Sequence, residues 1–273
     1  MTASSPIDFP LSTWLDPHSG DRFGHAELMQ SLSRQRVVLL GETHTRYDIH
    51  RWQLHVAAGL MAHRPIAMGF EMFQRRQQPV LDEWIAGGFA SEEAFLEAVE
   101  WAEVWRYDAA LYLPLFRFCR EFQVPMLALN CYRTLVTRVG KEGWDAIPVE
   151  ERDGLTPARP ALPAYRAYLA GVAGPPDRPR DEASSDRFVR AQQTWDRAFA
   201  CNIARAAEAP DAPLVLGIIG RGHLEYGYGT PYQLADLGID RVSVLLPADS
   251  PYDPARQPGI ADALFRLPPG SID

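Results

Sequence analysis

The chain has 273 residues, of which 47% are hydrophobic and 23% charged, proportions typical of a folded globular protein. Its formal net charge of -8 argues against a nucleic-acid partner held on a broad basic face. No run approaches the roughly 20 apolar residues that a membrane-spanning helix needs. Residues 1–20 lack the basic and apolar segments of a secretory signal and carry no lipid-attachment cysteine, so we expect a cytoplasmic protein. Cys119, Cys131 and Cys201 are scattered and odd in number, which favours reduced core cysteines over a disulfide framework.

Short apolar runs alternate along the chain with segments of helical periodicity. This alternation predicts βαβ units and an α/β fold with a mainly parallel sheet of about five strands. The expected strands are residues 36–40, 65–70, 125–129, 214–220 and 242–246. The expected helices are residues 47–61, 78–86, 91–102, 109–121, 131–139, 182–208 and 231–237. We expect a single domain over residues 1–273, with a proline-rich insertion around residues 145–185.

The first expected strand runs directly into Gly41, Glu42, Thr43 and His44. In an open parallel sheet, ligands bind in the crevice beyond the carboxyl ends of the strands. Gly41 would let the backbone turn, while Glu42 and His44 present an acid and a base at that edge. Imidazole suits general-base or metal-ligand work because its pKa lies near neutrality. The alternative is an ordinary strand-to-helix turn in which His44 caps the next helix.

The strand at residues 214–220 ends in the same way. Arg221, His223, Glu225, Tyr226 and Tyr228 follow it, interleaved with four glycines within ten residues. Glycines permit unusual backbone angles and a close approach to a ligand, which favours a functional segment over a flexible loop tip. The segment is not a phosphate loop, because no Gly-Lys-Ser/Thr follows.

Glu71 follows the second expected strand and would share a rim with Glu42, although a lone glutamate there is more often a helix-start residue. We therefore predict a catalytic centre of Glu42, His44, Glu71 and His223, with His44 and His223 as the metal ligands. His50 and His55 are five residues apart and do not share a helical face, so surface or core positions are the default. His50, which follows His44 by about one turn, is the exception that we expect near the site. The aromatic segment at residues 100–107 is either part of the core or a wall for a flat ligand.

Taken in chain order, these segments resemble the ChaN-like family of haem-binding uptake proteins. That family belongs to a superfamily with the Tiki/TraB proteins and the erythromycin esterases. The matching segments are residues 41–44, 50, 69–73, 105–114, 128–130, 193–196, 220–223 and 229–231. The resemblance implies a three-layer α/β/α sandwich with helical additions over the carboxyl edge of the strands. It also implies haem as the cofactor, a tyrosine as the iron ligand and two haems paired at a dimer interface.

The resemblance does not identify the tyrosine, and the candidates near matched segments are Tyr107, Tyr112, Tyr226 and Tyr228. The predicted ligand-binding residues are Arg221, Tyr226, Tyr228, Tyr107, Asn130 and His50. Typical haem-uptake members are lipoproteins, and residues 1–20 depart from that pattern.

The leading hypothesis is a haem- or porphyrin-binding protein that handles haem or iron. The partner expected for it is a second copy of the chain, in a homodimer. A tyrosine phenolate would be the axial ligand, and arginine or histidine side chains would hold the propionates. The alternative is a hydrolase, esterase- or peptidase-like, in which the Glu/His set works alone or with a divalent metal. Arg221 would then stabilise a developing oxyanion. A third hypothesis is an interaction module whose polar rim only caps helices.

Overall fold

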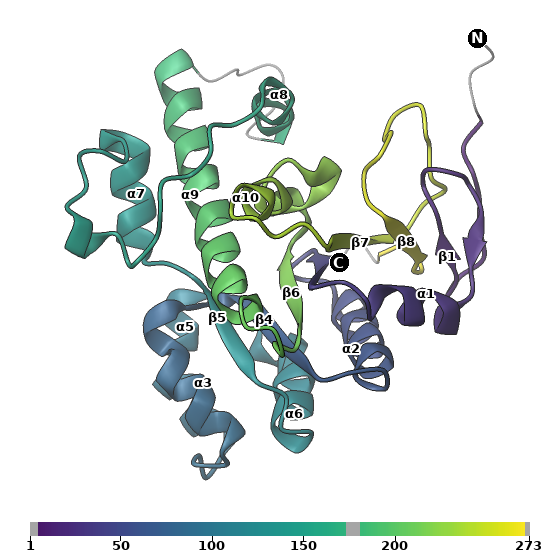
Figure 1. The fold of residues 1–273 in the computed structure, drawn as a ribbon, viewed down its shortest axis with the longest axis horizontal. Helices are drawn as coiled ribbons and strands as arrows, with labels where there is room; N and C mark the ends of the chain where they lie inside the picture. The colour runs from purple at the N-terminus through teal and green to yellow at the C-terminus, as the bar shows by residue number, and fades with distance from the viewer. Residues whose placement is uncertain (1–4, 173–180, 271–273) are drawn as a thin grey trace.

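The computed structural model describes residues 5–172 and 181–270, and in these ranges one eight-stranded sheet runs through the molecule (Figure 1). The strands are β1 (Trp14–Leu15), β2 (Arg22–Phe23), β3 (Val37–Glu42), β4 (Ile66–Gln74), β5 (Met126–Asn130), β6 (Leu214–Gly220), β7 (Val242–Ala248) and β8 (Ala263–Arg266). Their order is β2-β1-β8-β7-β3-β6-β4-β5. All pairings from β8 to β5 are parallel, and β1 is antiparallel to both of its neighbours. The predicted mainly parallel α/β fold is confirmed.

The centre of the sheet brings the two glycine-containing strand ends together. Every residue of β3 and of β6 is buried, as expected for parallel strands covered on both faces. The two strands pair in a register that places Glu42 opposite Gly220. The motifs that follow these strands therefore begin side by side at one edge of the sheet.

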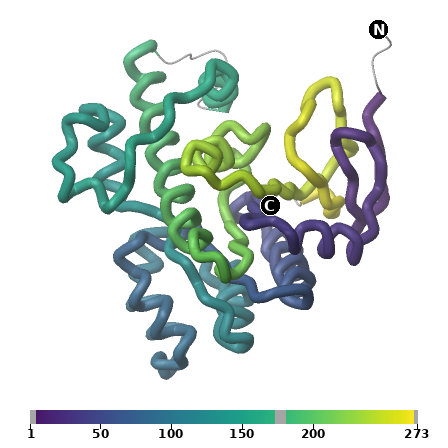
Figure 2. Tube along the Cα trace, viewed as in Figure 1, coloured from purple at the N-terminus to yellow at the C-terminus, as the bar shows by residue number. Residues whose placement is uncertain are grey.

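Helices cover both faces of the sheet (Figures 1 and 2). They are α1 (His25–Leu32), α2 (Tyr47–Met61), α3 (Gln78–Ile85), α4 (Glu92–Ala98), α5 (Trp101–Val104), α6 (Leu113–Glu121), α7 (Arg133–Glu142), α8 (Pro163–Val172), α9 (Glu182–Ala207) and α10 (Thr230–Asp236). One hydrophobic core joins the sheet to α1, α2, α3, α4 and α6, and a second joins its other face to α9 and α10. These layers are the expected α/β/α sandwich, with α7 packed on α9.

The sheet is wider than the sequence pattern predicted. The additional strands, β1, β2 and β8, have two to four residues each, too short for a clear periodic signal. The single helix expected at residues 91–102 is divided into α4 and α5, because Glu100 adopts a left-handed conformation with φ of 52°. Residues 1–4, at the start of the segment expected to lack a secretory signal, lie outside the described residues. Residues 173–180, in the predicted proline-rich insertion, also lie outside them. The single-domain assignment stays a prediction.

The structure bears on the expectations about the cysteines and about membrane-spanning helices. Cys119, Cys131 and Cys201 are all buried and form no disulfide bond. Within residues 5–172 and 181–270, no helix has both the length and the apolar character needed to cross a membrane.

Candidate functional site

A cavity of about 630 Å³ lies at the edge of the sheet where β4, β5 and β6 end. Its volume falls in the range of about 300–1,000 Å³ that is usual for small-molecule sites. The lining residues are His44, Glu71, Met72, Gln74, Arg76, Glu100, Glu103, Val104, Trp105, Arg106, Tyr107, Asn130, Cys131, Arg133, Trp195 and His223. Polar groups from the strand ends therefore meet an aromatic wall built largely by the segment after α4.

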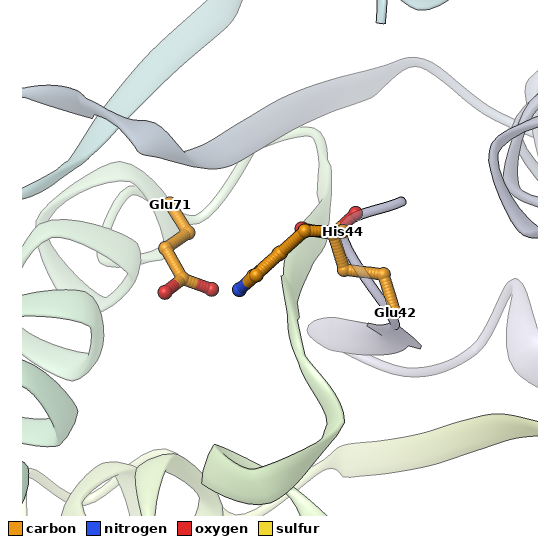
Figure 3. Close-up of side chains that lie close together, drawn as sticks. All are labelled: Glu42, His44 and Glu71. Carbon is orange, nitrogen blue, oxygen red and sulfur yellow. The ribbon is translucent and has the colours of Figure 1, made fainter. Parts of the chain in front are cut away.

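His44 lies between two carboxylates. Its Nδ1 is 2.7 Å from Oε1 of Glu42, and a ring nitrogen points toward the carboxylate of Glu71 (Figure 3). Burial by itself lowers the pKa of His44, but the hydrogen bond with Glu42 and the negative charges of Glu71 and Glu42 outweigh it, so the pKa is raised. The rings of Trp105 and Tyr107 cover His44, with centroids at 4.8 and 5.0 Å. This environment favours the protonated imidazole.

Glu42 is buried, does not line the cavity and contacts several polar side chains. Its Oε2 accepts a hydrogen bond from the hydroxyl of Tyr112 at 3.2 Å and lies 3.3 Å from Nδ1 of His50. Nε2 of His50 in turn lies 3.3 Å from the carbonyl oxygen of His44. Burial, together with the charge of Glu42, raises the pKa of Tyr112 far above its usual value, so its hydroxyl keeps its proton. Tyr112 and His50 thus hold the Glu42–His44 pair in place.

Glu71 belongs to β4, which continues four residues beyond the expected end at Phe70, to Gln74. The pairing of β4 with β5 shifts register between Phe70 and Gln74, and such irregularities redirect side chains at functional edges. Oε2 of Glu71 accepts a hydrogen bond from the backbone N–H of Gly220 at 2.6 Å. Burial raises the pKa of Glu71, and the nearby His223 and His44 only partly oppose it.

Glu42, His44 and Glu71 form the one group in the described residues whose ligand atoms are arranged to hold a metal ion, with all of them within 4.8 Å of one another. Of the two predicted metal ligands, His44 belongs to this group and His223 does not. Two carboxylates and an imidazole suit divalent ions such as zinc or manganese.

His223 also lines the cavity, on a short 3-10 helix (Arg221–His223) that follows β6, and its side chain likewise contacts a buried carboxylate. Its Nδ1 is 2.8 Å from Oδ1 of Asp196, a fully buried residue of α9. Burial lowers the pKa of His223, but the charge and hydrogen bond of Asp196 and the charge of Glu71 raise it overall. Asp196 is not among the site residues predicted from the sequence. A signal was present, since Asp196 lies on the apolar face that Phe199 and Ile203 continue three and seven residues later.

The other predicted ligand-binding residues separate into two groups. Tyr107 and Asn130 line the cavity, whereas Arg221, Tyr226, Tyr228 and His50 do not. The Arg221 guanidinium forms an ion pair with Glu225. The rings of Tyr226 and Tyr228 stack at 5.3 Å beside α8, away from the cavity. The lining residues that are not among the predicted site residues include Arg76, Arg106, Arg133 and Trp195.

The sequence model of the family described as haem-binding uptake, Tiki superfamily, ChaN matches residues 28–234. The chain belongs to this family of α/β proteins. No curated protein matches the chain. Among solved structures, the fold is similar to ChaN of Campylobacter jejuni, described with cofacial heme binding, at a TM-score of 0.73 and 18% identity over 93% of this chain and 98% of that one.

Two bacterial effectors share the fold more distantly. The type III effector HopBA1 matches at a TM-score of 0.52 and 13% identity, over 90% of this chain and 94% of that one. RRSP, a MARTX toxin effector domain from Vibrio vulnificus, matches at a TM-score of 0.50 and 15% identity, over 89% of this chain but 39% of that one. At these identities the similarity establishes the fold alone.

The raised pKa values of the site predict a protein that becomes less stable as the pH rises. The pKa values of Glu71, His44 and His223 lie above their usual values of 4.5 and 6.5. A group with a raised folded-state pKa contributes its full stabilisation below the unfolded pKa and loses it as the pH rises through the folded pKa. We therefore expect the free energy of unfolding, measured by urea denaturation from about pH 5 to pH 9, to fall less steeply in Glu71→Gln than in the wild type. The exposed Glu97→Gln is the control, and an unchanged slope in Glu71→Gln would contradict the prediction.

Proposed function

We propose that this protein binds haem in the cavity beside His44, with Tyr107 as the iron ligand. The observation that carries the proposal is the position of Tyr107, which is the one tyrosine lining the cavity among the residues that the structure describes. Tyr112 is engaged by Glu42 and keeps its proton, and Tyr226 and Tyr228 lie elsewhere. Phenolate is an established axial ligand of haem iron.

The rest of the lining fits the chemistry of a porphyrin. Trp105, Trp195 and Met72 offer flat or flexible apolar surface to a macrocycle. Arg133 lines the cavity and makes no ion pair with any described residue, so its guanidinium is available to a propionate. Arg106 donates to the carbonyl oxygen of Glu103 and likewise lacks an acidic partner in the described ranges. The family to which the chain belongs, and the cofacial heme binding described for the Campylobacter jejuni protein, support the same ligand.

A haemin titration followed at the Soret band tests this proposal. We expect a band shift at micromolar haemin for the wild type, and for Tyr107→Phe an affinity at least about tenfold lower, equivalent to about 1.4 kcal/mol. Tyr132→Phe is the matched control, because both tyrosines are 38% exposed but Tyr132 does not line the cavity. Absence of a band shift in the wild type, or equal affinities of wild type and Tyr107→Phe, would overturn the proposal.

Hydrolysis is a second candidate function, favoured by the two imidazole–carboxylate pairs that face one cavity. His44 rests on Glu42 and His223 on Asp196, an arrangement that activates water when an imidazole nitrogen is free. Elemental analysis for bound metal, followed by an esterase and peptidase screen, tests it. Activity that is unchanged in His44→Ala and in His223→Ala would exclude this function.

A further inference from the structure

Asp196 links the elements that surround His223. Its Oδ2 accepts a hydrogen bond from the hydroxyl of Tyr165 in α8 at 2.7 Å, and its Oδ1 accepts one from Thr230 in α10 at 3.3 Å. The same Oδ1 lies 2.8 Å from Nδ1 of His223. Each of these donors helps to stabilise a carboxylate that is this deeply buried, and no single one of them is its sole partner. Asp196 therefore joins three helices to the residue that enters the cavity.

The backbone at Gly229 approaches both Asp196 and His223 closely. A β-carbon at Gly229 would lie 2.5 Å from the carbonyl oxygen of His223 and 2.6 Å from Oδ1 of Asp196. Only glycine allows this approach without displacing backbone atoms. The chain thus packs tightly around the Asp196–His223 contact.

An ionised carboxylate can only accept a hydrogen bond, so Nδ1 of His223 must carry a proton and donate the hydrogen bond to Asp196. In the neutral ring the electron pair then lies on Nε2. Nε2 of His223 has no hydrogen-bond partner among the described residues, and the side chain lines the cavity. His44 differs, because its Nδ1 contacts Glu42 and its other ring nitrogen points at Glu71 (Figure 3).

We propose that Asp196 is the positioning residue of the site, because it fixes the tautomer of His223 so that the Nε2 electron pair faces the cavity. In addition to the phenolate of Tyr107, this nitrogen, and not a ring nitrogen of His44, is then the electron-pair donor that a bound ligand meets. The inference rests on the proposed function in one respect, that the cavity is the ligand site. Asp196 touches no ligand and acts only through His223. The arrangement corresponds to the carboxylate–histidine pairs that orient metal-binding imidazoles.

The decisive variant is Asp196→Asn, which keeps the size of the side chain. One amide oxygen can still accept from Tyr165, while the amide N–H₂ now faces Nδ1 of His223 and donates to it. The proton of the neutral ring is then expected on Nε2, because Nδ1 has become an acceptor. Tyr165→Phe is the matched control, since it removes a hydrogen bond from Asp196 but leaves Oδ1 for His223.

Nitrogen-15 NMR of the ligand-free protein tests the tautomer directly, at a pH where the imidazole is neutral. We expect an unprotonated Nε2 for His223 in the wild type and in Tyr165→Phe, and the two nitrogen signals interchanged in Asp196→Asn. A protonated Nε2 in the wild type, or no interchange in Asp196→Asn, would overturn the inference. If Asp196→Asn does not fold, the wild-type spectrum still tests the expected tautomer, and a protonated Nε2 would overturn the inference.

Haemin serves as the probe of the donor role. Asp196→Asn and His223→Ala should change the Soret spectrum of the haemin complex in the same way, while Tyr165→Phe should leave it unchanged. A spectrum that is identical in wild type and His223→Ala would exclude His223 as the donor. Failure of the wild type to bind haemin at all would instead count against the proposed function, and the ligand-free NMR result would stand separately.

Discussion

Replacing Glu42 with alanine should lower the free energy of unfolding by about 3–5 kcal/mol, the usual cost of removing one partner from a buried charge pair. Glu42 is 1% exposed and contacts His44, His50 and the hydroxyl of Tyr112. Without its carboxylate, the hydroxyl of Tyr112 loses an acceptor and Nδ1 of the buried His50 loses the oxygen that lies 3.3 Å away. Urea denaturation followed by circular dichroism measures the loss.

One further variant separates the charge of Glu42 from its volume, and a variant at an exposed position is the control. Glu42→Gln keeps an acceptor for Tyr112 and should cost clearly less than the alanine variant. Glu97→Ala, at an exposed position of α4, should change stability by less than about 0.5 kcal/mol. A loss below about 1 kcal/mol in Glu42→Ala would show that the polar cluster contributes little to folding.

Phe116→Ala should be similarly destabilising, by about 3–5 kcal/mol, because it opens a cavity in the main core. Phe116 in α6 is fully buried. Its ring contacts those of Phe70, Phe73, Phe95, Trp101 and Tyr112. Thermal or urea unfolding measures the effect.

The control for Phe116 lies at the end of the same helix. Phe122 is 57% exposed, so Phe122→Ala should cost less than about 1 kcal/mol. Through Trp101 and Tyr112 the same core supports the aromatic wall and Glu42, and a folded Phe116→Ala protein should therefore also bind haemin more weakly. Equal stabilities of the two alanine variants would contradict the assignment of Phe116 to the core.

The sequence predicted the central strands and the polar residues at their carboxyl ends, because both features are visible within a few consecutive residues. Continuous apolar runs marked β3 and β6, and the polar residues directly after them had to meet at one edge, since parallel strands end on the same side. Glu42, His44, Glu71 and His223 were placed together by this argument. The assignment of a role to each of them stays a prediction.

The pairing of His223 with Asp196 could not be predicted in the same way. The two residues are 27 positions apart, and a side chain on the apolar face of α9 has no local signal for its partner. The sequence likewise could not show which of the candidate tyrosines lines the cavity. Tyr226 and Tyr228 follow the glycine-rich strand end, yet the left-handed conformation of Tyr226, with φ of 59°, accompanies a turn toward α8.

The sequence by itself determined the α/β class, the parallel centre of the sheet and the acids and imidazoles at its edge, because hydrophobic periodicity and residue order are enough for these features. Only the tertiary structure decided that Glu42 is a buried support, that Asp196 holds His223 and that Tyr107 faces the cavity. The physical reason is that these properties depend on packing between segments distant in the chain, which fixes burial, hydrogen-bond partners and pKa values together.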